Sequence, residues 1–399
     1  MEIQVDAVPT AVHTSTHPQH TPETFKPLLS KLISSPSSFS RSDAVLAFEH
    51  LLDPTSTYPS QIGSFLTALH LSGREADDDV LAGGAEVLRR HAILVDVPPE
   101  QAASGKDRVV VDIVGTGGDG HDTYNVSTTA AIVAAGAGAR VYKHGNRAST
   151  SSSGSADLLM ALGCPLSPPR ASSSQQQPPF RFLLAPHHHP LLAPLAPIRR
   201  SIPHRSIFNL LGPLVNPSRP AAIVLGVARP ELGATFARAL AKDETMQRAW
   251  VVCGFEGLDE ISCAGPTRVW EFRRREGGGE EESEGAVDGG VIKEFVVDPT
   301  EFGLQPHALE TVKGGKGPEE NAQTFIQLLD PNGKRDEDEG KLGPIRDFVL
   351  MNTAAVLLVA GIVEGLPQGV QLARESIASG RAWDAFCAFK EWDRAQAGQ

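Results

Sequence analysis

The sequence predicts an α/β protein in which a mostly parallel central sheet is flanked by helices, with a smaller α-helical domain before it. The first observation is the order strand, glycine loop, helix, strand, loop and helix between Val109 and Asp157, because crossover helices join parallel strands in this way. The second is helical periodicity between Phe25 and Ala92. The third is a length of 399 residues with 41% hydrophobic composition, enough for two or three domains of about 150 residues each.

The N-terminal part predicts a helical domain preceded by a flexible tail. Residues 1–22 are rich in Thr, Pro and His and show no periodicity, a composition that does not fill a core. Residues 23–104 are expected to form the helical domain, joined by part of 165–204. Apolar residues recur there at helical spacing in four segments: Phe25–Ile33, Ser42–Leu52, Pro59–Leu71 and Asp78–Ala92.

The first predicted strand of the α/β domain ends in a glycine loop. Val109–Val114 is a β-branched run typical of a buried strand, and Gly115–Gly120 follows it. Glycines let backbone N–H groups approach a ligand, although a simple tight turn is an alternative. The loop lacks the Lys-Ser/Thr ending of a P-loop and the spacing of the dinucleotide fingerprint. We therefore interpret it as a phosphate cradle of another kind.

The next segment adds a helix N-terminus to this loop. Asn125–Thr128 precedes an alanine-rich helix that is predicted over Thr129–Ala137. Its Asn, Ser and Thr residues offer capping side chains, and the first turn leaves N–H donors unpaired at the positive end of the helix dipole. Such an end favours a bound phosphate, whereas a purely structural cap is the alternative.

A second strand, Ala139–Tyr142, brings a basic loop to the same region. Lys143–Arg147 follows this strand, and serines between Ser149 and Ser155 lead into a helix that Gly163 ends. Because open α/β sheets bind ligands at the carboxyl ends of their strands, we expect these loops to converge on one site.

Two adjacent carboxylates follow a further buried strand, Ala249–Cys253. Asp259 and Glu260 lie in the loop Gly257–Ser262. Magnesium takes few protein carboxylates and keeps its other positions for water or substrate oxygens, so this pair and a hydroxyl such as Ser127 would suffice beside a pyrophosphate. Most Asp-Glu pairs are merely solvated, and the neighbouring phosphate cradle is what favours a metal here.

A block of arginines lies between the basic loop and the acidic one. Ile198–Arg200 and Arg205 supply guanidinium groups, which can hold a carboxylate by two parallel hydrogen bonds. This suits an acidic acceptor substrate, although ordinary surface charge is the alternative. We interpret Phe208–Leu214 as packing and turn chemistry rather than as a ligand contact.

In this order the motifs resemble the anthranilate phosphoribosyltransferases of tryptophan biosynthesis. The resemblance covers roughly Ala44 to Phe389 and rests on six segments: Gly115–Asp119, Asn125–Thr128, Lys143–Arg147, Ser153–Asp157, Phe208–Pro213 and Gly257–Glu260. It implies transfer of phosphoribose from phosphoribosyl pyrophosphate (PRPP) to the amine of anthranilate, with magnesium (Mg²⁺) and release of pyrophosphate. It also implies an α/β domain over 105–164 and 205–395, a helical domain hinged across the active site, and a homodimer formed through the helical domain.

The resemblance assigns ligand contacts by position in these motifs. The residues expected to bind PRPP are Gly115, Gly118, Asp119, Thr123, Asn125, Val126, Ser127, Thr128, Lys143 and Ser155. Those expected at anthranilate are Gly115, His144, Asn146 and Arg199, with Arg200 as the alternative to Arg199. Those expected at magnesium, directly or through water, are Ser127, Asp259 and Glu260. The expected catalytic residues are Lys143, His144, Asp259 and Glu260.

These residue types suit the implied chemistry. Breaking the ribose C1–O bond places positive charge on the sugar and negative charge on pyrophosphate, so magnesium and Lys143 are expected to stabilise the charge that develops. The aromatic amine of anthranilate is neutral and weakly basic, and it needs positioning more than deprotonation. His144 either orients the amine or accepts its proton late, and the first role is favoured.

Composition excludes some classes of protein. A formal net charge of -12 argues against a general nucleic-acid binder. Four cysteines without CxxC spacing favour reduced thiols over a disulfide. No run reaches the ~18 apolar residues of a membrane span, and Thr353–Val363 predicts a buried helix. The first 25 residues lack an apolar core and arginines, so no secretory or mitochondrial signal is expected and the cytoplasm is predicted.

Four segments do not follow the compact pattern. Residues 273–290, with a glycine triplet and glutamates, and the charged residues 331–341 are predicted to be mobile insertions. Residues 167–179 carry Pro, Ser and Gln where the family has helix-forming sequence, which puts the packing of the domain hinge in question. His187–His189 suggests zinc, but three consecutive residues cannot face one ion from a regular element, and structural or substrate-side roles are favoured.

Two other functions fit part of the pattern. Pyrimidine nucleoside phosphorylases share the implied fold and also cleave at ribose C1, yet they would lack Lys143–Arg147 and the Asp259–Glu260 pair in these contexts. A non-catalytic PRPP-binding protein would bind PRPP without consuming anthranilate.

Overall fold

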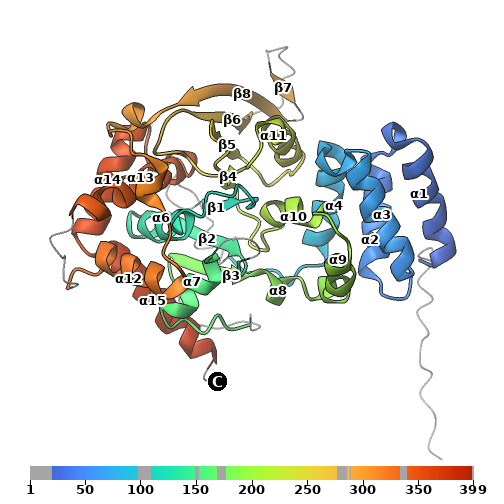
Figure 1. Ribbon diagram of the computed structural model, residues 1–399, viewed down its shortest axis with the longest axis horizontal. Coiled ribbons are helices and arrows are strands. Elements are labelled where there is room, and N and C mark those ends of the chain that lie inside the picture. The colour runs from blue at the N-terminus through green and yellow to red at the C-terminus, as the bar shows by residue number, and fades with distance from the viewer. Residues whose placement is uncertain are drawn as a thin grey trace, which may run out of the picture.

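A computed structural model gives the fold of the chain. It describes residues 20–97, 109–148, 152–168, 177–275, 285–287, 289–332 and 339–397. A bundle of helices lies at one end of the molecule, and a sheet with helices on both faces lies at the other (Figure 1).

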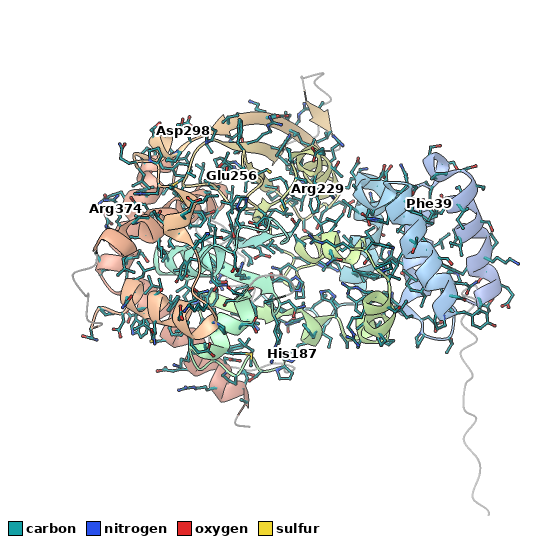
Figure 2. The ribbon with its side chains drawn as sticks, viewed as in Figure 1. Phe39, His187, Arg229, Glu256, Asp298 and Arg374 are labelled. Atoms are coloured by element: carbon teal, nitrogen blue, oxygen red, sulfur yellow. The ribbon has the colours of Figure 1, made fainter. Side chains whose placement is uncertain are left out.

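Four helices form the N-terminal bundle: α1 (Pro22–Ser34), α2 (Arg41–Leu52), α3 (Pro59–Leu71) and α4 (Asp78–Arg90). Aromatic rings fill its centre, among them Phe39, which is fully buried and labelled in Figure 2. Side chains cap the helix starts: Thr21 and Thr24 cap α1 reciprocally, which starts this helix inside the segment predicted to be a tail. Residues 1–19 lie outside the described part of the chain.

The sheet has eight strands: β1 (Val110–Gly115), β2 (Arg140–Gly145), β3 (Phe180–Leu184), β4 (Ala222–Gly226), β5 (Arg248–Gly254), β6 (Thr267–Arg274), β7 (Ala286–Val287) and β8 (Gly290–Val297). Their spatial order is β3-β2-β1-β4-β5-β6-β8-β7. The first five strands in this order, from β3 through β2, β1 and β4 to β5, pair in parallel. Strands β6, β8 and β7 continue the sheet with antiparallel pairing. The predicted α/β class with a mostly parallel sheet is confirmed.

Helices cover both faces of the sheet. One face packs on α6 (Val126–Gly136), α7 (Ser155–Ala161), α12 (Pro318–Leu329), α13 (Glu339–Val359), α14 (Leu366–Ala378) and α15 (Arg381–Ala397). The other face meets α10 (Phe208–Leu211) and α11 (Gly233–Ala241), while α8 (Ala185–His188) and α9 (Ala196–Ser201) lead from β3 to the bundle. Short 3₁₀ turns occur at Pro36–Ser38, Arg74–Ala76, Pro190–Leu195, Gly212–Leu214, Pro230–Leu232, Pro299–Phe302 and Leu309–Val312.

The helical bundle shares a hydrophobic core with one face of the sheet. Strand β4 alternates, so that Val224 packs with α6 and α13 whereas Ile223 and Leu225 pack with the bundle side. Ion pairs add to this seam between α4 and α11. Lys242 contacts Asp78 at 2.5 Å, and Arg89 contacts Asp243 at 3.3 Å.

Several element boundaries differ from the prediction. Helix α6 begins at Val126 rather than Thr129, because the Ser and Thr residues interpreted as its cap lie inside its first turn. Lys143 and His144 belong to β2 and are buried, whereas the sequence placed them in a loop. The insertion 273–290 contains the two-residue strand β7, with residues 276–284 and 288 outside the described part. The insertion 331–341 ends inside α13, and its residues 333–338 lie outside the described part of the chain.

Helix α13 is the core helix of the sheet's first face. Its segment Leu342–Val359 is long and apolar enough to cross a membrane, yet 72% of that window is buried inside the protein. It packs on α6 and α14. The buried helix predicted at Thr353–Val363 is confirmed only as far as Val359, where α13 ends.

Two further predictions concern sulfur and the Pro-Ser-Gln segment. All four cysteines lie in described residues and are free, as expected for reduced thiols. In the segment 167–179, residues 167–168 and 177–179 form no helix, and residues 169–176 lie outside the described part. Gln177 accepts a hydrogen bond from the Tyr142 hydroxyl at 2.7 Å, which fixes the chain before β3.

Candidate active site

The acidic loop rests on two glycines at the ends of neighbouring strands. Gly115 ends β1 and lies opposite Gly226 at the end of β4. A Cβ atom at Gly115 would collide with the carboxylate of Asp259, and a Cβ atom at Gly226 would collide with its backbone. Gly115, which the sequence singled out as a ligand contact, therefore also lets the acidic loop approach the glycine loop.

Asp259 also fixes the conformation of the glycine loop. Its Oδ2 accepts a hydrogen bond of 2.6 Å from the backbone N–H of Gly117. Gly117, Gly118 and Gly120 have φ angles of +66°, +82° and +78°, a region that L side chains rarely adopt. The phosphate cradle and the acidic pair, far apart in sequence, thus form one unit.

Carboxylates crowd together at this unit. Burial, and then the nearby Asp119, raise the pKa of Asp259 to about 7. Burial and Asp259 raise the pKa of Glu260 to about 8, although Lys143 and a hydrogen bond with Ser127 lower it. This excess of negative charge would be relieved by a divalent cation, so the residues fit magnesium. Among the described residues no group of three His, Cys, Asp or Glu could hold a metal alone, which leaves room for substrate oxygens.

The N-terminus of α6 is open toward the glycine loop. Asn125 precedes the helix but makes no capping hydrogen bond, contrary to the prediction. Its side chain instead donates to the backbone oxygen of Ser153 and accepts from Asn321, each at 2.8 Å. Val126 and Thr128 are buried, and the backbone N–H of Val126 already donates to the backbone oxygen of Tyr124. Thr123 lies just before this helix and pairs with Lys313 in an isolated β-bridge.

Lys143 is the buried cation of the site. Its Nζ donates a hydrogen bond to the backbone oxygen of Ile113 on the neighbouring strand. Burial lowers its pKa, while the charges of Asp112, Glu260 and Asp259 raise it, in that order of size. One hydrogen bond leaves two of the three ammonium protons for other acceptors.

His144 is buried beside Lys143 as a neutral imidazole. Its Nδ1 lies 3.1 Å from the backbone oxygen of Gly212 and so carries the proton of that hydrogen bond. Its Nε2 is buried and has no partner among the described residues. Burial, followed by the charge of His189, lowers the pKa of His144 to about 3. The ring therefore presents a lone pair that accepts a hydrogen bond but holds a proton poorly.

Asn146 and Ser155 lie together beyond the end of β2. The Ser155 hydroxyl is 3.5 Å from the backbone oxygen of Asn146, whose side-chain oxygen accepts from the N–H of Arg147 at 2.8 Å. Asn146 is exposed and Ser155 is half-buried. Residues 149–151, between them, lie outside the described part of the chain.

Two neighbouring cavities adjoin the segment 205–209. One of about 450 Å³ is lined by the glycine loop and by His70 of the bundle, with Arg229 and Glu256 on the sheet side (Figure 2). The other, of about 600 Å³, is lined by Arg199 and Arg200. Both are bounded by the segment 205–206 and by residue 209.

Arg199 faces this second cavity from α9. Its guanidinium stacks over the ring of Phe208 at 4.8 Å, and burial lowers its pKa. In the described part of the chain, no hydrogen bond or ion pair links it to Asn146 or His144, so the predicted anthranilate residues do not form one contact network. Arg200 is more exposed than Arg199, which favours Arg199 of the two.

Arg205 is a site residue to which the sequence assigned no specific role. Its guanidinium lies 3.3 to 3.4 Å from the backbone oxygens of Thr116 and Gly117. A Cβ atom at Gly118 would collide with it. Arg205 stood in the predicted arginine block, but only the folded seam reveals that it reaches the glycine loop.

Two histidines of the triplet make structural hydrogen bonds. His188 and His189 bond to the backbone oxygens of Ile93 and Val215, at 2.7 and 3.0 Å. His189 also meets the ring of His144 edge to face, with centroids 5.3 Å apart. The favoured structural or substrate-side interpretation agrees with these contacts.

Two family models match consecutive parts of the chain. Residues 107–383 match the model of the glycosyl transferase family, a/b domain, and residues 26–92 match the glycosyl transferase family, helical bundle domain.

Relatives of high identity share one name. Anthranilate phosphoribosyltransferase of Schizosaccharomyces pombe is 45% identical over 327 residues, 81% of this chain and 84% of the relative. That of Thermomicrobium roseum is 40% identical over 82% of this chain and 85% of the relative.

Solved structures agree with the sequence comparisons. The anthranilate phosphoribosyltransferase of Saccharomyces cerevisiae in complex with PRPP and Mg superposes with a TM-score of 0.79 at 33% identity, covering 94% of this chain and 99% of that one. The enzyme of Thermus thermophilus gives 0.76 at 36% identity, covering 92% and 99%. The chain therefore belongs to the anthranilate phosphoribosyltransferases of the glycosyl transferase family.

Proposed function

We propose that the protein transfers the 5-phosphoribosyl group of PRPP to the amine of anthranilate, releasing pyrophosphate, as the second step of tryptophan synthesis from chorismate. The observation that carries this proposal is the joined unit of glycine loop and acidic loop, in which Gly117 donates to Asp259. It lies beside the open N-terminus of α6 and the buried Lys143. These are the groups that a sugar phosphate with a charged leaving group requires.

Related enzymes support the choice of substrates. The yeast structure contains PRPP and Mg, and a further yeast structure, with a TM-score of 0.77 at 31% identity, contains 4-fluoroanthranilate. By position we assign PRPP to the glycine loop, to residues 123–128, to Lys143 and to Ser155. We assign magnesium to Ser127, Asp259 and Glu260.

The negative charge that develops on the departing pyrophosphate determines which groups of the site stabilise the reaction. Magnesium, when bound, supplies positive charge next to the pyrophosphate oxygens. Lys143 adds a fixed ammonium in a dry setting, where a charge is worth more than in water, and the first-turn N–H groups of α6 hold a phosphate group. Because these groups are in place before reaction, little reorganisation is needed as the ribose C1–O bond breaks.

The amine is oriented rather than deprotonated in the ground state. The neutral imidazole of His144 presents Nε2 as an acceptor, and an N–H of anthranilate is a matching donor. With a pKa of about 3, this imidazole is a weak base, so it can take the proton only after the new C–N bond has made the amine acidic.

We assign anthranilate, the acceptor, to the boundary between the bundle and the sheet. Arg199, with Asn146 and Gly115 as the further predicted contacts, is proposed to bind the carboxylate of anthranilate, and the guanidinium fork suits that group. We further propose that residues 23–104 and part of 165–204 form the domain that closes over residues 105–164 and 205–395. The cavity shared by His70 and the glycine loop supports a site between the two.

The test follows the loss of anthranilate fluorescence by the purified protein with PRPP and Mg²⁺. We expect loss only when both are present, with pyrophosphate formed in equal amount. Consumption of a pyrimidine nucleoside with phosphate and without Mg²⁺ would instead support a nucleoside phosphorylase. Binding of PRPP without any turnover would support a non-catalytic protein.

We also propose a homodimer formed through the bundle. A groove of about 710 Å³ runs between α1 and α3, and Ile33 and Leu71 at its edge are 61% and 79% exposed. An apolar patch of this kind favours a protein partner. Leu71→Glu is expected to shift the mass in analytical ultracentrifugation from dimer to monomer, with Leu191→Glu, an exposed leucine outside this groove, as control; a wild-type monomer contradicts the proposal.

For location, we propose the cytoplasm. Small anionic substrates and the net charge of -12 support a protein that binds neither nucleic acid nor membrane. Imaging of a fluorescent fusion tests this, and an organellar signal contradicts it.

A further inference from the structure

A fully buried carboxylate lies under the site and has no role in the mechanism above. Asp112 is in β1 with 0% of its surface exposed. Its Oδ2 accepts a hydrogen bond of 2.7 Å from the side-chain amide of Asn216 and lies 3.5 Å from the backbone N–H of His144. Its Oδ1 is buried and has no hydrogen-bond partner among the described residues.

Asn216 uses its full bonding capacity to hold this carboxylate. The second proton of its amide goes to the backbone oxygen of Tyr142 at 2.8 Å. Its Oδ1 accepts from the N–H and the hydroxyl of Ser218, at 2.9 and 2.7 Å. Asn216 therefore joins β1 and β2 to the segment Gly212–Ser218 through fully satisfied, buried hydrogen bonds, which fix a single arrangement.

The same segment sets the orientation of His144. Gly212, at its start, accepts the hydrogen bond from Nδ1 and thereby leaves Nε2 unprotonated. Val215 accepts from Nε2 of His189, whose ring packs against that of His144. If the bond between Asp112 and Asn216 is lost, the segment that carries the backbone oxygen fixing the tautomer of His144 loses its link to β1 and keeps only the bond of Asn216 to Tyr142 in β2.

Asp112 also balances the charge of Lys143. Among the three carboxylates whose charge acts on Lys143, Asp112 has the largest effect, ahead of Glu260 and Asp259. The latter two are assigned to the cation, so Asp112 is the carboxylate that remains for Lys143 in the loaded site. An amide side chain at this position of β1 could accept the same hydrogen bonds, but only a carboxylate supplies this charge. A buried oxygen without a partner is costly, and the charge on Lys143 is a reason to keep it.

We propose that Asp112, held by Asn216, is a positioning residue that places the Lys143 ammonium and the His144 imidazole on the two sides of the bond that reacts. This inference rests on the proposed function. It assigns Asp112 no contact with substrate. Misplacement of catalytic groups by about 1 Å lowers the rate by about a hundredfold while leaving much of the binding intact, which defines what to measure.

The experiment uses two variants and a matched control in the full-length protein. Asp112→Asn removes the charge and keeps the shape, and Asn216→Ala removes the hydrogen bonds and keeps the charge. Asp393→Asn is the control, because Asp393 is also a buried carboxylate, 3% exposed, that accepts from the backbone N–H groups of Leu166 and Ser167 away from the site. For each protein, kcat and both KM values are measured, with PRPP binding in Mg²⁺ by calorimetry and Tm by scanning.

We expect kcat to fall about tenfold or more in both Asp112→Asn and Asn216→Ala, while the Kd for PRPP stays within about threefold of the wild type. Asp393→Asn should lower Tm and leave kcat within about twofold. The proposal is overturned if kcat of Asp112→Asn stays within about twofold of the wild type, or if both site variants lose PRPP binding together with a lowered Tm, which would indicate a structural role only. If Asp112→Asn does not fold, Asn216→Ala alone decides by the same criteria. A wild-type protein that neither binds PRPP nor consumes anthranilate overturns the proposed function instead.

Discussion

Single residues of the site lie in environments that push their protonation in opposite directions. Burial keeps His144 neutral, with a pKa lowered to about 3, whereas burial and crowding raise the pKa of Glu260 to about 8. At neutral pH the imidazole is neutral and the acid is mostly protonated, which separates the two tasks of the site. The imidazole is assigned to orient a neutral amine, and the acid is assigned to bind a cation.

The role of His144 is tested by its removal. His144→Ala is expected to lower kcat/KM for anthranilate about tenfold to a hundredfold, because one oriented hydrogen bond is lost, while KM for PRPP stays near the wild-type value. The pH dependence of the wild type from pH 6 to 8 should lack a limb that belongs to this histidine. His91→Ala, on the exposed end of α4, is the control. An acid limb near pH 6.5 that disappears in His144→Ala would identify a general base instead.

The acidic pair predicts a pH-dependent demand for magnesium. The pKa values of Asp259 and Glu260 are raised to about 7 and 8, so both groups become charged only as pH rises through these values. Protons therefore compete with Mg²⁺, and the Mg²⁺ concentration for half-maximal turnover at saturating PRPP should fall from pH 6 to pH 9. Glu260→Gln, which cannot bind the second proton, should reduce the slope of this dependence. The same slope in wild type and variant would contradict the assignment.

Some helices and strands could be predicted from the sequence with their correct bounds, and others could not. Helix α3 was predicted with its observed bounds, Pro59–Leu71, because a proline starts it and apolar spacing continues to its end. Helix α6 and β2 were placed less well. Polar residues at a ligand site look like loop in a sequence, yet Lys143 and His144 lie buried in a strand because the site itself satisfies them.

Contacts over long sequence separations could not be predicted. The bond between Asp112 and Asn216 joins residues 104 positions apart, and that between Gly117 and Asp259 joins residues 142 apart. The site residues came from motifs and their order, but nothing in the sequence says which backbone oxygen faces which side chain. The same limit kept Arg205 from receiving a specific role.

The glycine loop supplies a test at the scale of elements. Gly117→Ala and Gly118→Ala both force a side chain into a positive φ region, but only the second also displaces Arg205. KM for PRPP is expected to rise about fivefold more in Gly118→Ala than in Gly117→Ala. Arg205→Ala combined with Gly118→Ala should raise KM no further than Gly118→Ala alone, because the contact of Arg205 with the loop is already lost. Equal values for the two single variants would show that Arg205 does not support the loop.

At the scale of the whole molecule, the bundle and the sheet are joined along α4 and α11. Asp78 accepts from both Lys242 and Arg238, and these partners lower its pKa against the opposing effect of burial. The shared core of Ile223 and Leu225 with the bundle side lies behind these ion pairs. The two parts are therefore continuous here, while the cavity lined by His70 and the glycine loop lies between them.

The ion pairs of this seam predict a stability that depends on pH. Lys242→Ala should lower the free energy of unfolding by about 1 kcal/mol near pH 7, since the pair is partly exposed. The folded pKa of Asp78 lies below 3.8, so its contribution is present above that value and is lost as pH falls through the folded pKa. Urea unfolding should show the full difference at pH 7 and a progressively smaller one as pH falls below 3.8. Lys31→Ala, which removes an ion pair within the bundle, controls for a general charge effect, and a difference that does not shrink with falling pH would contradict the argument.

The continuity of α4 with α11 has a mechanical consequence. A body fastened along one side can only swing about that side, and displacement then grows with distance from the axis. Helix α9, which carries Arg199, lies on the side of the bundle away from α11 (Figure 1), so it would move further than α4 for the same small rotation. Anthranilate would thus be bound last and released first as the bundle moves. PRPP, which is assigned to the sheet domain, would stay bound through successive openings.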